Sequence, residues 1–215
     1  MARILIIGGH GKVARLLEPI LAERGDTVSA VIRNPDHAVD VTATAAAPVV
    51  ADVERFDLDQ LTNLVAGNHA VVWAAGAGGG DASRTYAVDR DAAMRAIDAA
   101  RAAGVRRFVM VSWIGSRAGH GVDPDNSFFA YADAKWAADA HLHDSGLDWT
   151  IVAPGALTDD PPTGRIRLDP DGDGAVSRAD VAAVVAASLA EPATIGRTLR
   201  FGNGDMPIAE ALRTR

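Results

Sequence analysis

Short apolar runs, each about the length of a β-strand, alternate along this chain with longer segments that carry a helical repeat. The apolar runs lie at about 3–7, 27–32, 48–51, 70–74, 106–112 and 149–153. The segments between them predict helices at about 11–24, 57–66, 84–103 and 129–145. Nearly continuous apolar strands are typical of a parallel sheet that helices cover on both faces. The alternation therefore predicts an α/β protein with a doubly wound parallel sheet.

A glycine follows each predicted helix at the position where a helix usually ends. These residues are Gly25, Gly67, Gly104 and Gly146. Glycine is favoured there because the backbone that follows a helix often adopts a positive φ. The four glycines therefore predict where the four helices end.

The length of 215 residues suits one generous domain better than two small ones. We expect a single nucleotide-binding domain over 1–215, because no long linker or internal repeat interrupts the alternation. Residues 154–215 are too few for an independent substrate domain, and they predict a small C-terminal lobe on the substrate side of the same domain. Within that lobe, residues 164–168 predict a strand and residues 181–189 predict a helix.

Composition excludes several classes of function. The net charge of −7 argues against a nucleic-acid partner, which would require a basic surface. The absence of cysteine excludes disulfides, thiolate metal sites and thiol catalysis. No apolar stretch approaches the roughly 20 residues that span a bilayer, and the amino-terminal run is too short for a signal peptide. We expect a cytoplasmic protein with a small-molecule substrate and no membrane partner, and a homo-oligomer is compatible with the sequence.

A glycine-rich segment joins the first strand to the first helix. Gly8, Gly11 and Ala14 form a G-x-x-G-x-x-A pattern, a variant of the dinucleotide fingerprint. Its glycines permit a tight turn and a close approach of the backbone to a pyrophosphate, whose charge the helix amides would face. The alternative is a turn that serves only the connection. The pattern predicts a Rossmann-type cofactor site that includes Gly8, Gly9, His10, Gly11, Lys12 and Val13.

The residues after the second and third strands bear on the choice of cofactor. Arg33 stands where an acidic residue would accept the ribose hydroxyls of NAD, and its cation suits the 2′-phosphate of NADP. We therefore expect NADP, with NAD as the alternative if Asp36 serves the ribose instead. Asp52, followed by Val53, could accept the adenine amino group, and a helix-capping role is the alternative.

A Y-x-x-x-K pattern on the fourth predicted helix supplies a candidate acid or base. Tyr131 and Lys135 are one helical turn apart, so the ammonium can lie beside the phenol and lower its pKa from about 10. The alternative is a tyrosine packed on the sheet beside a solvated lysine. Ser112 ends the fifth strand at the sheet edge where open α/β folds bind ligands. Trp113 follows it and either walls a substrate pocket or packs elsewhere.

These residues together resemble the short-chain dehydrogenase/reductase superfamily. Within that superfamily, the chain most resembles the atypical NAD(P)H-binding branch, called NAD-dependent epimerase/dehydratase-like or NmrA-like. Beyond the motifs above, it rests on Ala74, Ala75 and Gly76 after the fourth strand, on residues 86–89 and on residues 145–155. It implies that Ala74, Ala75 and Gly76 contact the cofactor.

The resemblance also implies roles for the candidate catalytic residues. Ser112 would position a substrate oxygen, Tyr131 would transfer the proton and Lys135 would hold the nicotinamide ribose. The implied function is an NADP(H)-dependent oxidoreductase that acts on a small carbonyl-type substrate. Two alternatives stay open, since some members of the branch only sense the cofactor and others are epimerases that use it transiently.

An acidic loop matches the spacing of a calcium-binding loop. Residues 169–180 place acids at loop positions 1, 3, 5 and 12 and glycine at position 6. No helix precedes this loop, and the closing residue is aspartate instead of glutamate. We therefore expect no metal, and we read the loop as a hairpin turn after which Ser177 caps a helix, with Asp180 three residues on.

Overall fold

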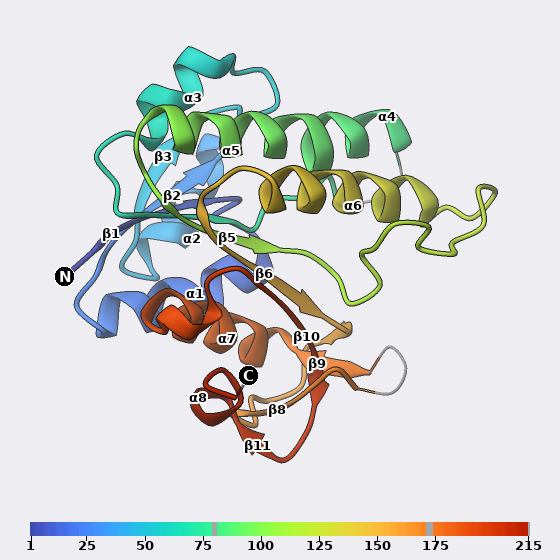
Figure 1. Ribbon diagram of the computed structural model, residues 1–215. Coiled ribbons are helices and arrows are strands. Elements are labelled where there is room, and N and C mark those ends of the chain that lie inside the picture. The colour runs from blue at the N-terminus through green and yellow to red at the C-terminus, as the bar shows by residue number, and fades with distance from the viewer. Residues whose placement is uncertain (79–80, 171–173, 215) are drawn as a thin grey trace.

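The computed structural model describes residues 1–78, 81–170 and 174–214, and within them a nine-stranded sheet organises the chain (Figure 1). The strand order is β11-β8-β10-β6-β5-β4-β1-β2-β3. The seven strands from β10 to β3 pair in parallel, whereas β8 and β11 are antiparallel additions at one end. In chain order the strands of this sheet are β1 (Arg3–Ile7), β2 (Thr27–Ile32), β3 (Ala47–Val50), β4 (Ala70–Trp73), β5 (Arg107–Val111), β6 (Asp148–Pro154), β8 (Arg165–Leu168), β10 (Arg197–Asn203) and β11 (Met206–Pro207).

Helices cover both faces of this sheet, as the sequence predicted (Figure 1). The predicted doubly wound α/β fold is thereby confirmed. The α-helices are α1 (Lys12–Glu23), α2 (Ala38–Thr42), α3 (Leu58–Val65), α4 (Ala82–Thr85), α5 (Ala93–Ala102), α6 (Phe129–His143), α7 (Arg178–Ala190) and α8 (Ile208–Ala211). Shorter helical segments are η1 (Pro35–His37), η2 (Tyr86–Ala92) and η3 (Pro192–Thr194), of which η2 is a π-helix that joins α4 to α5.

The two faces of the sheet form two separate apolar cores. In β1 the side chains of Ile4 and Ile6 belong to the core under α1 and α7, whereas Leu5 and Ile7 belong to the core under α3 and α5. This division follows from the alternation of side chains along a strand. Because both faces are buried, the central strands are mostly apolar, which is why their sequences show no regular alternation of polar and apolar residues.

The glycines predicted to end the helices do so. Gly25, Gly67, Gly104 and Gly146 all have positive φ angles, between 71° and 86°. Each lies just past α1, α3, α5 or α6, where an L-residue with a side chain would be strained. The short connections that result bring each chain segment back to the sheet within a few residues.

The sheet has a switch point between β1 and β4. The chain leaves β1 for β2 and β3 on one side, and then crosses to β4, β5 and β6 on the other. The connections from the carboxyl ends of β1 and β4 therefore diverge, and they leave a crevice in which open α/β sheets bind ligands.

The C-terminal residues add to this sheet. β10 pairs in parallel with β6, and β7 (Ala156–Thr158) pairs with β9 (Ala175–Ser177) in a separate two-stranded sheet. The strand predicted at 164–168 is β8, and the helix predicted at 181–189 is α7. No helix in residues 1–78, 81–170 and 174–214 combines the length and the apolarity needed to cross a bilayer.

The acidic loop ends as a helix cap. The Ser177 hydroxyl accepts a hydrogen bond from the Asp180 amide at 3.0 Å, which confirms the predicted capping role. The Asp180 carboxylate is fully buried and accepts hydrogen bonds from the Thr163 and Gly164 amides and from the Thr163 and Ser177 hydroxyls. This carboxylate is therefore committed to internal contacts. Two further acids of the calcium-like pattern, Asp171 and Asp173, lie outside the described residues.

A buried glutamate makes the stability of the fold depend on pH. Glu18, on the inner face of α1, is fully buried and accepts a hydrogen bond from the Thr44 hydroxyl at 2.5 Å. Burial raises the pKa of Glu18 from 4.5 to about 7, although the Thr44 hydrogen bond and Arg15 oppose the shift. A carboxyl group whose pKa is raised by folding stabilises the fold below its unfolded pKa, and that contribution is lost as the pH rises through the folded pKa.

We therefore expect the free energy of unfolding of the wild-type protein to fall by about 3 kcal/mol between about pH 5 and pH 8.5 through Glu18 alone. Glu18→Gln should remove this part of the pH dependence and be the more stable form at the alkaline end. Urea unfolding at the two pH values measures the difference. The exposed Glu23, on the same helix, supplies the control Glu23→Gln, which should keep the wild-type dependence. Identical dependence in Glu18→Gln and wild type would contradict the assignment.

Candidate cofactor and active sites

The turn after β1 fits closely between two neighbouring strands. Gly8 has a φ of +94°, and a Cβ atom there would lie 2.5 Å from the backbone nitrogen of Ala75. A Cβ atom on Gly9 would lie 2.6 Å from the Cβ atom of Ala30. The amides of Gly8 and Gly9 both donate hydrogen bonds to the carbonyl of Val31, at 3.3 and 2.8 Å. Only glycine fits at these positions, so the turn brings bare backbone to the crevice.

The helix that follows offers its amides to an anion. Gly11 is the N-cap of α1, and no side chain caps the helix there. The first turn of α1 contains no acidic residue. The partial positive charge of this helix start is therefore free of a competing carboxylate, as a pyrophosphate site requires.

A pocket of about 290 Å³ lies in the crevice beside this turn. Nine of the residues predicted from the sequence line it, namely Gly8, His10, Gly11, Arg33, Asp52, Val53, Ala74, Ala75 and Gly76. The sequence did not point to nine further lining residues, which are Ile7, Val31, Ile32, Asn34, His37, Ala51, Glu54, Arg84 and Val88. Asp36 lies outside this lining. The pocket therefore gathers the ends of β1, β2, β3 and β4.

Three residues of the glycine-rich segment that were predicted to bind the cofactor are not among the described lining residues of this pocket. Gly9 packs beneath the turn on Ala30. The Lys12 ammonium is exposed and forms an ion pair with Asp159 at 3.0 Å. Val13 packs against the core under α1.

Two arginines and a glutamate form the polar end of the pocket. The Glu54 carboxylate lies 3.7 Å from the Arg33 guanidinium and 3.5 Å from that of Arg84. Arg84 also donates a hydrogen bond to the carbonyl of Ala77 at 2.6 Å. Arg33 therefore faces the pocket with a second cation nearby and a carboxylate that partly balances both.

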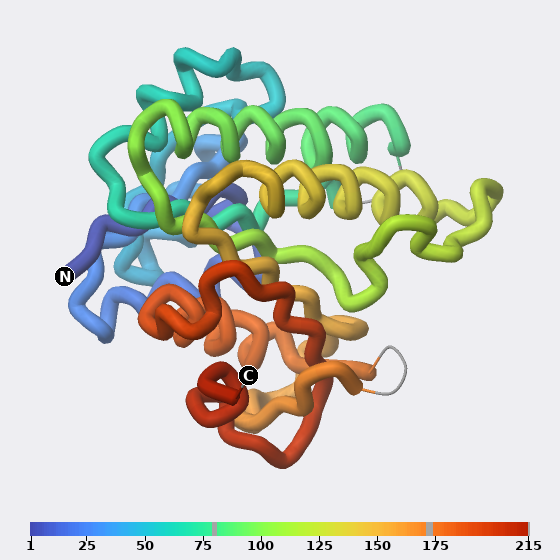
Figure 2. Tube along the Cα trace, in the orientation of Figure 1, coloured from blue at the N-terminus to red at the C-terminus, as the bar shows by residue number. Residues whose placement is uncertain are grey.

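A second pocket, of about 390 Å³, lies at the carboxyl ends of β5 and β6. Its described lining consists of Ser112, Trp113, Ile114, Phe128, Tyr131, Pro154, Gly155, Ala156 and Leu157. Ser112 and Tyr131 thus reach the same cavity from β5 and α6, as the sequence predicted. Trp113 also lines this pocket, and its contact with a substrate stays a prediction. Figure 2 shows that the chain between β5 and α6, which contributes Trp113 and Phe128, extends along one end of the molecule.

Behind this pocket lies a buried group of charges. Lys135 is 1% exposed, and its ammonium donates a hydrogen bond to the carbonyl of Val111 at 2.7 Å. Burial raises the pKa of both Asp89 and Asp139, and the ammonium of Lys135 opposes the shift at each carboxyl group. Lys135 is therefore no solvated lysine, and it balances two buried acids.

Each of the two acids holds part of the site in place. One Asp139 oxygen accepts hydrogen bonds from the hydroxyls of Ser112 and Ser116, the latter at 2.6 Å. One Asp89 oxygen accepts a hydrogen bond from the Ala77 amide at 2.9 Å, in the loop after β4. The orientation of Ser112 toward the pocket therefore depends on Asp139.

The expected lowering of the Tyr131 pKa is wrong. Burial raises the pKa of Tyr131 above its ordinary value, and the carboxyl groups of Asp89 and Asp139 raise it further. Lys135 does not offset this shift, because its ammonium is directed to Val111 and to the same two acids. Tyr131 therefore keeps its proton at neutral pH, as it would at its ordinary pKa, and the upward shift makes its phenol a weaker acid.

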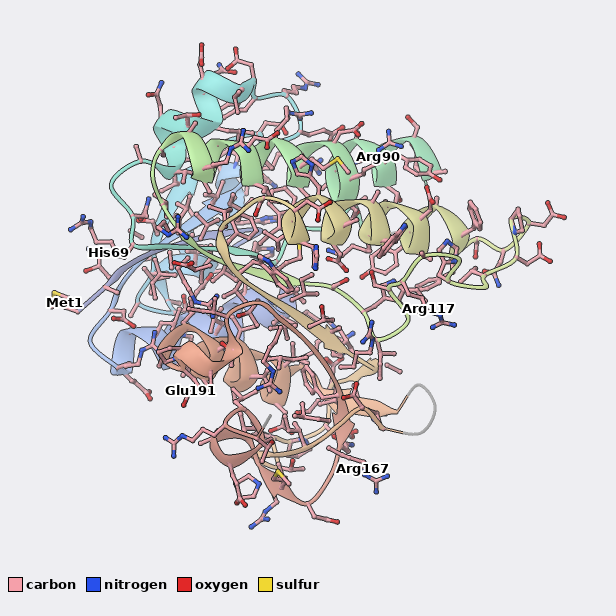
Figure 3. All side chains as sticks on the ribbon, in the orientation of Figure 1. Met1, His69, Arg90, Arg117, Arg167 and Glu191 are labelled. Carbon is pink, nitrogen blue, oxygen red and sulfur yellow. The ribbon has the colours of Figure 1, made fainter. Side chains whose placement is uncertain are left out.

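The other tyrosine of the chain has different surroundings. Tyr86 begins η2, and the guanidinium of Arg90, a residue labelled in Figure 3, lies 4.7 Å from the centre of the Tyr86 ring. Tyr86 does not belong to the described lining of either pocket. Tyr131 is thus the tyrosine that the fold brings to a candidate active site.

Comparison with known proteins identifies the family. A model of an NAD(P)H-binding family matches residues 8–192, which include the glycine turn and every described lining residue of the two pockets except Ile7. The chain belongs to this NAD(P)H-binding family. Over 98% of its length this NAD(P)H-binding protein is 35% identical to the uncharacterised sugar epimerase YhfK of Bacillus subtilis, of which it covers 99%.

Solved structures show the same fold. A Bacillus halodurans protein of the NAD-dependent epimerase/dehydratase type has a TM-score of 0.91 and 35% identity, with 99% of each chain covered. The oxidoreductase YlbE of Lactococcus lactis has a TM-score of 0.87 and 27% identity, with coverage of 98% of this chain and 94% of the other. The NAD(P)H-binding protein therefore shares its whole fold with oxidoreductase-like and epimerase-like proteins.

Proposed function

We propose that this protein is an NADP(H)-dependent oxidoreductase that transfers a hydride to or from a small carbonyl-type substrate. The observation that carries the proposal is the second pocket, which Ser112 and Tyr131 both line at the carboxyl edge of the sheet. The same edge carries the glycine turn and the first pocket. Cofactor and substrate would therefore be held side by side along one edge.

The residues of the first pocket fit a nicotinamide dinucleotide. The uncapped start of α1 and the bare backbone of the glycine turn would hold the pyrophosphate. Arg33, with Arg84 nearby, would hold the 2′-phosphate that distinguishes NADP from NAD. When bound, the cofactor would supply or accept a hydride at the substrate carbonyl carbon. In the reductive direction the Tyr131 hydroxyl would give the carbonyl oxygen its proton.

The side chains of the second pocket have separate tasks. Tyr131 holds the proton at its hydroxyl group, because its raised pKa keeps the phenol neutral. Because the Ser112 hydroxyl donates its proton to Asp139, its oxygen would accept a hydrogen bond from the hydroxyl group of the alcohol form of the substrate, whereas a carbonyl oxygen would receive its hydrogen bond from Tyr131. Lys135 balances Asp89 and Asp139, and its contact with a nicotinamide ribose stays a prediction.

The name of the Bacillus subtilis relative favours a second candidate, a sugar epimerase. An epimerase would return the hydride to the substrate and leave no net change in the cofactor. Stopped-flow absorbance of the NADPH-loaded protein, mixed with a panel of aldehydes, ketones and quinones, separates the candidates. Lasting oxidation of NADPH supports the oxidoreductase. A stable NADPH signal across the panel would contradict it and leave the epimerase or a catalytically silent sensor.

Cofactor choice can be tested at Arg33. Replacing Arg33 by alanine should weaken NADPH binding by about 10- to 150-fold, which corresponds to the roughly 1.5–3 kcal/mol of a charge-assisted contact, and should leave NADH binding nearly unchanged. Calorimetric titration with both cofactors measures the effect. The exposed Arg101 on α5 provides the control Arg101→Ala, which should change neither affinity. Equal losses for NADPH and NADH in Arg33→Ala would contradict the NADP assignment.

A further inference from the structure

We propose that the second pocket takes a flat aromatic carbonyl compound in preference to a sugar. The inference rests on the proposed oxidoreductase function for its chemistry, because a carbonyl group is the part of the ligand that would react. It rests on the walls of the pocket for its selectivity. Eight of the nine described lining residues present an aromatic ring, an aliphatic side chain or bare backbone, and Ser112 is the exception.

Three aromatic rings in contact form one wall. The Trp113 and Phe128 rings meet edge to face, with their centres 5.0 Å apart and their planes at 86°. Phe128 in turn meets Tyr131 at 5.0 Å, with the planes at 46°. Such edge and tilted contacts leave ring faces and edges for a further aromatic ring to pack against. The wall ends at Tyr131, so a ring packed along it would hold its carbonyl group near the Tyr131 hydroxyl.

The position of Trp113 is built into the backbone. A Cβ atom on Gly115 would lie 2.1 Å from the Trp113 ring, so the indole packs directly on a residue that has no side chain. The Ser116 amide donates to the Trp113 carbonyl at 3.0 Å, and the Ile114 amide donates to the Pro154 carbonyl at 2.8 Å. The loop is thereby closed on itself and tied to β6. The aromatic wall is therefore held in place before any ligand arrives.

The mouth of the pocket exposes apolar side chains. Phe128, at the start of α6, is 41% exposed, and Leu157, on β7, is 37% exposed. Covering such surface with an apolar ligand is favourable by roughly 25 cal/mol per Å² of area removed from water. An apolar ring would therefore bind more favourably by covering Phe128 and Leu157, whereas a hydrated ligand would bury little of this apolar surface.

The described lining of the pocket carries few side-chain polar groups, and besides two hydroxyls they include the indole N–H of Trp113, which has no hydrogen-bond partner. Among the described lining residues, the side-chain hydroxyls are those of Ser112 and Tyr131. A carbonyl oxygen can accept a hydrogen bond from Tyr131, whereas a sugar presents a hydroxyl group on nearly every carbon. Each sugar hydroxyl buried without a partner costs about 1–3 kcal/mol. The described wall thus discriminates against sugars by leaving their hydroxyl groups unpaired.

Binding of two probe compounds tests the proposal independently of turnover. Isothermal titration of the whole protein, with and without NADP⁺, should show that 2-acetonaphthone binds at least tenfold more tightly than methyl glucoside. Leu157→Asp should weaken binding of 2-acetonaphthone at least tenfold by placing a carboxylate at the apolar mouth. The control is Ile195→Asp, at a residue that is 42% exposed and outside the pocket, and it should leave binding unchanged. Thermal melts of both variants check that they fold.

The outcomes separate this inference from the proposed function. If methyl glucoside binds as tightly as 2-acetonaphthone, or if Leu157→Asp binds 2-acetonaphthone like wild type, the aromatic assignment is overturned. Oxidation of NADPH by glyceraldehyde without binding of 2-acetonaphthone would overturn the ligand class and leave the oxidoreductase standing. Binding of 2-acetonaphthone that Leu157→Asp weakens, without NADPH oxidation by any carbonyl compound, would support the ligand class and overturn the oxidoreductase.

Discussion

Replacing Tyr131 by phenylalanine should lower turnover of a verified carbonyl substrate by roughly 10²–10⁴-fold, the usual contribution of a positioned acid or base. NADPH affinity should stay at the wild-type value, because Tyr131 lies in the second pocket and outside the described lining of the first. The aromatic ring is kept, so the contact with Phe128 and the shape of the wall survive the substitution. Single-turnover stopped-flow measurement of NADPH oxidation isolates the chemical step.

The protein supplies its own control for this experiment, because Tyr86 is its only other tyrosine. Tyr86→Phe removes a hydroxyl group outside both described pocket linings and should leave turnover unchanged. Since the raised pKa of Tyr131 keeps its phenol protonated, the reductive rate of the wild type should also stay level across the neutral range. Wild-type turnover in Tyr131→Phe would remove Tyr131 as the proton donor.

Lys135→Met should destabilise the fold by about 3–5 kcal/mol at about pH 8, the range for breaking a buried ion pair from one side. The substitution leaves the carboxyl groups of Asp89 and Asp139 without their buried cation, and Arg84 and Arg200 act on them as weaker partners. Both pKa values should then rise further above their ordinary value. The penalty is therefore largest where the unfolded chain has both groups ionised, and it shrinks as acid protonates them in the folded state.

Urea unfolding at about pH 5 and about pH 8 measures this difference. Lys12 is the other lysine of the chain, and it is exposed in an ion pair with Asp159. Lys12→Met should therefore change the free energy of unfolding by less than about 0.5 kcal/mol at either pH. Equal losses for Lys135→Met at both pH values would show that the lysine contributes by packing alone.

Local sequence signals predicted most of the fold because they arise from local physics. Continuous apolar runs marked the central strands, since both sheet faces are buried, and glycines marked the helix ends, since the backbone there needs a positive φ. The same signals failed at β10, which pairs with β6 although Arg197 and Arg200 interrupt its apolar pattern. Several side chains of β10 are partly exposed, so this strand does not need to be apolar along its whole length. Its sequence therefore lacks the continuous apolar run that predicted the other strands.

The candidate site was predictable where one segment determines it. The glycine turn and the Tyr131–Lys135 spacing belong to single elements, and the structure brings Ser112 and Tyr131 to one pocket. The pKa of Tyr131 was not predictable from that spacing, because Asp89 comes from a different element, η2. The Asp89 carboxyl group raises the pKa of Tyr131 and also interacts with the ammonium of Lys135. Glu54 and Arg84 were missed for the same reason, since neither belongs to a motif and both reach the first pocket through tertiary packing.

The close fit of the glycine turn bears on how this cofactor loop can be inherited or transplanted. Gly8 packs directly on the backbone of Ala75, just after β4. Gly9 packs on Ala30 in β2, where a side chain larger than alanine would not fit. The glycine fingerprint therefore depends on two contact residues, Ala30 and Ala75, which lie roughly 20 and 65 residues further along the chain. A graft of residues 8–14 into another sheet would succeed only if its neighbours at both contacts came with it, so loop exchange between distant relatives should carry the whole segment from β1 to the end of β4 and Ala75.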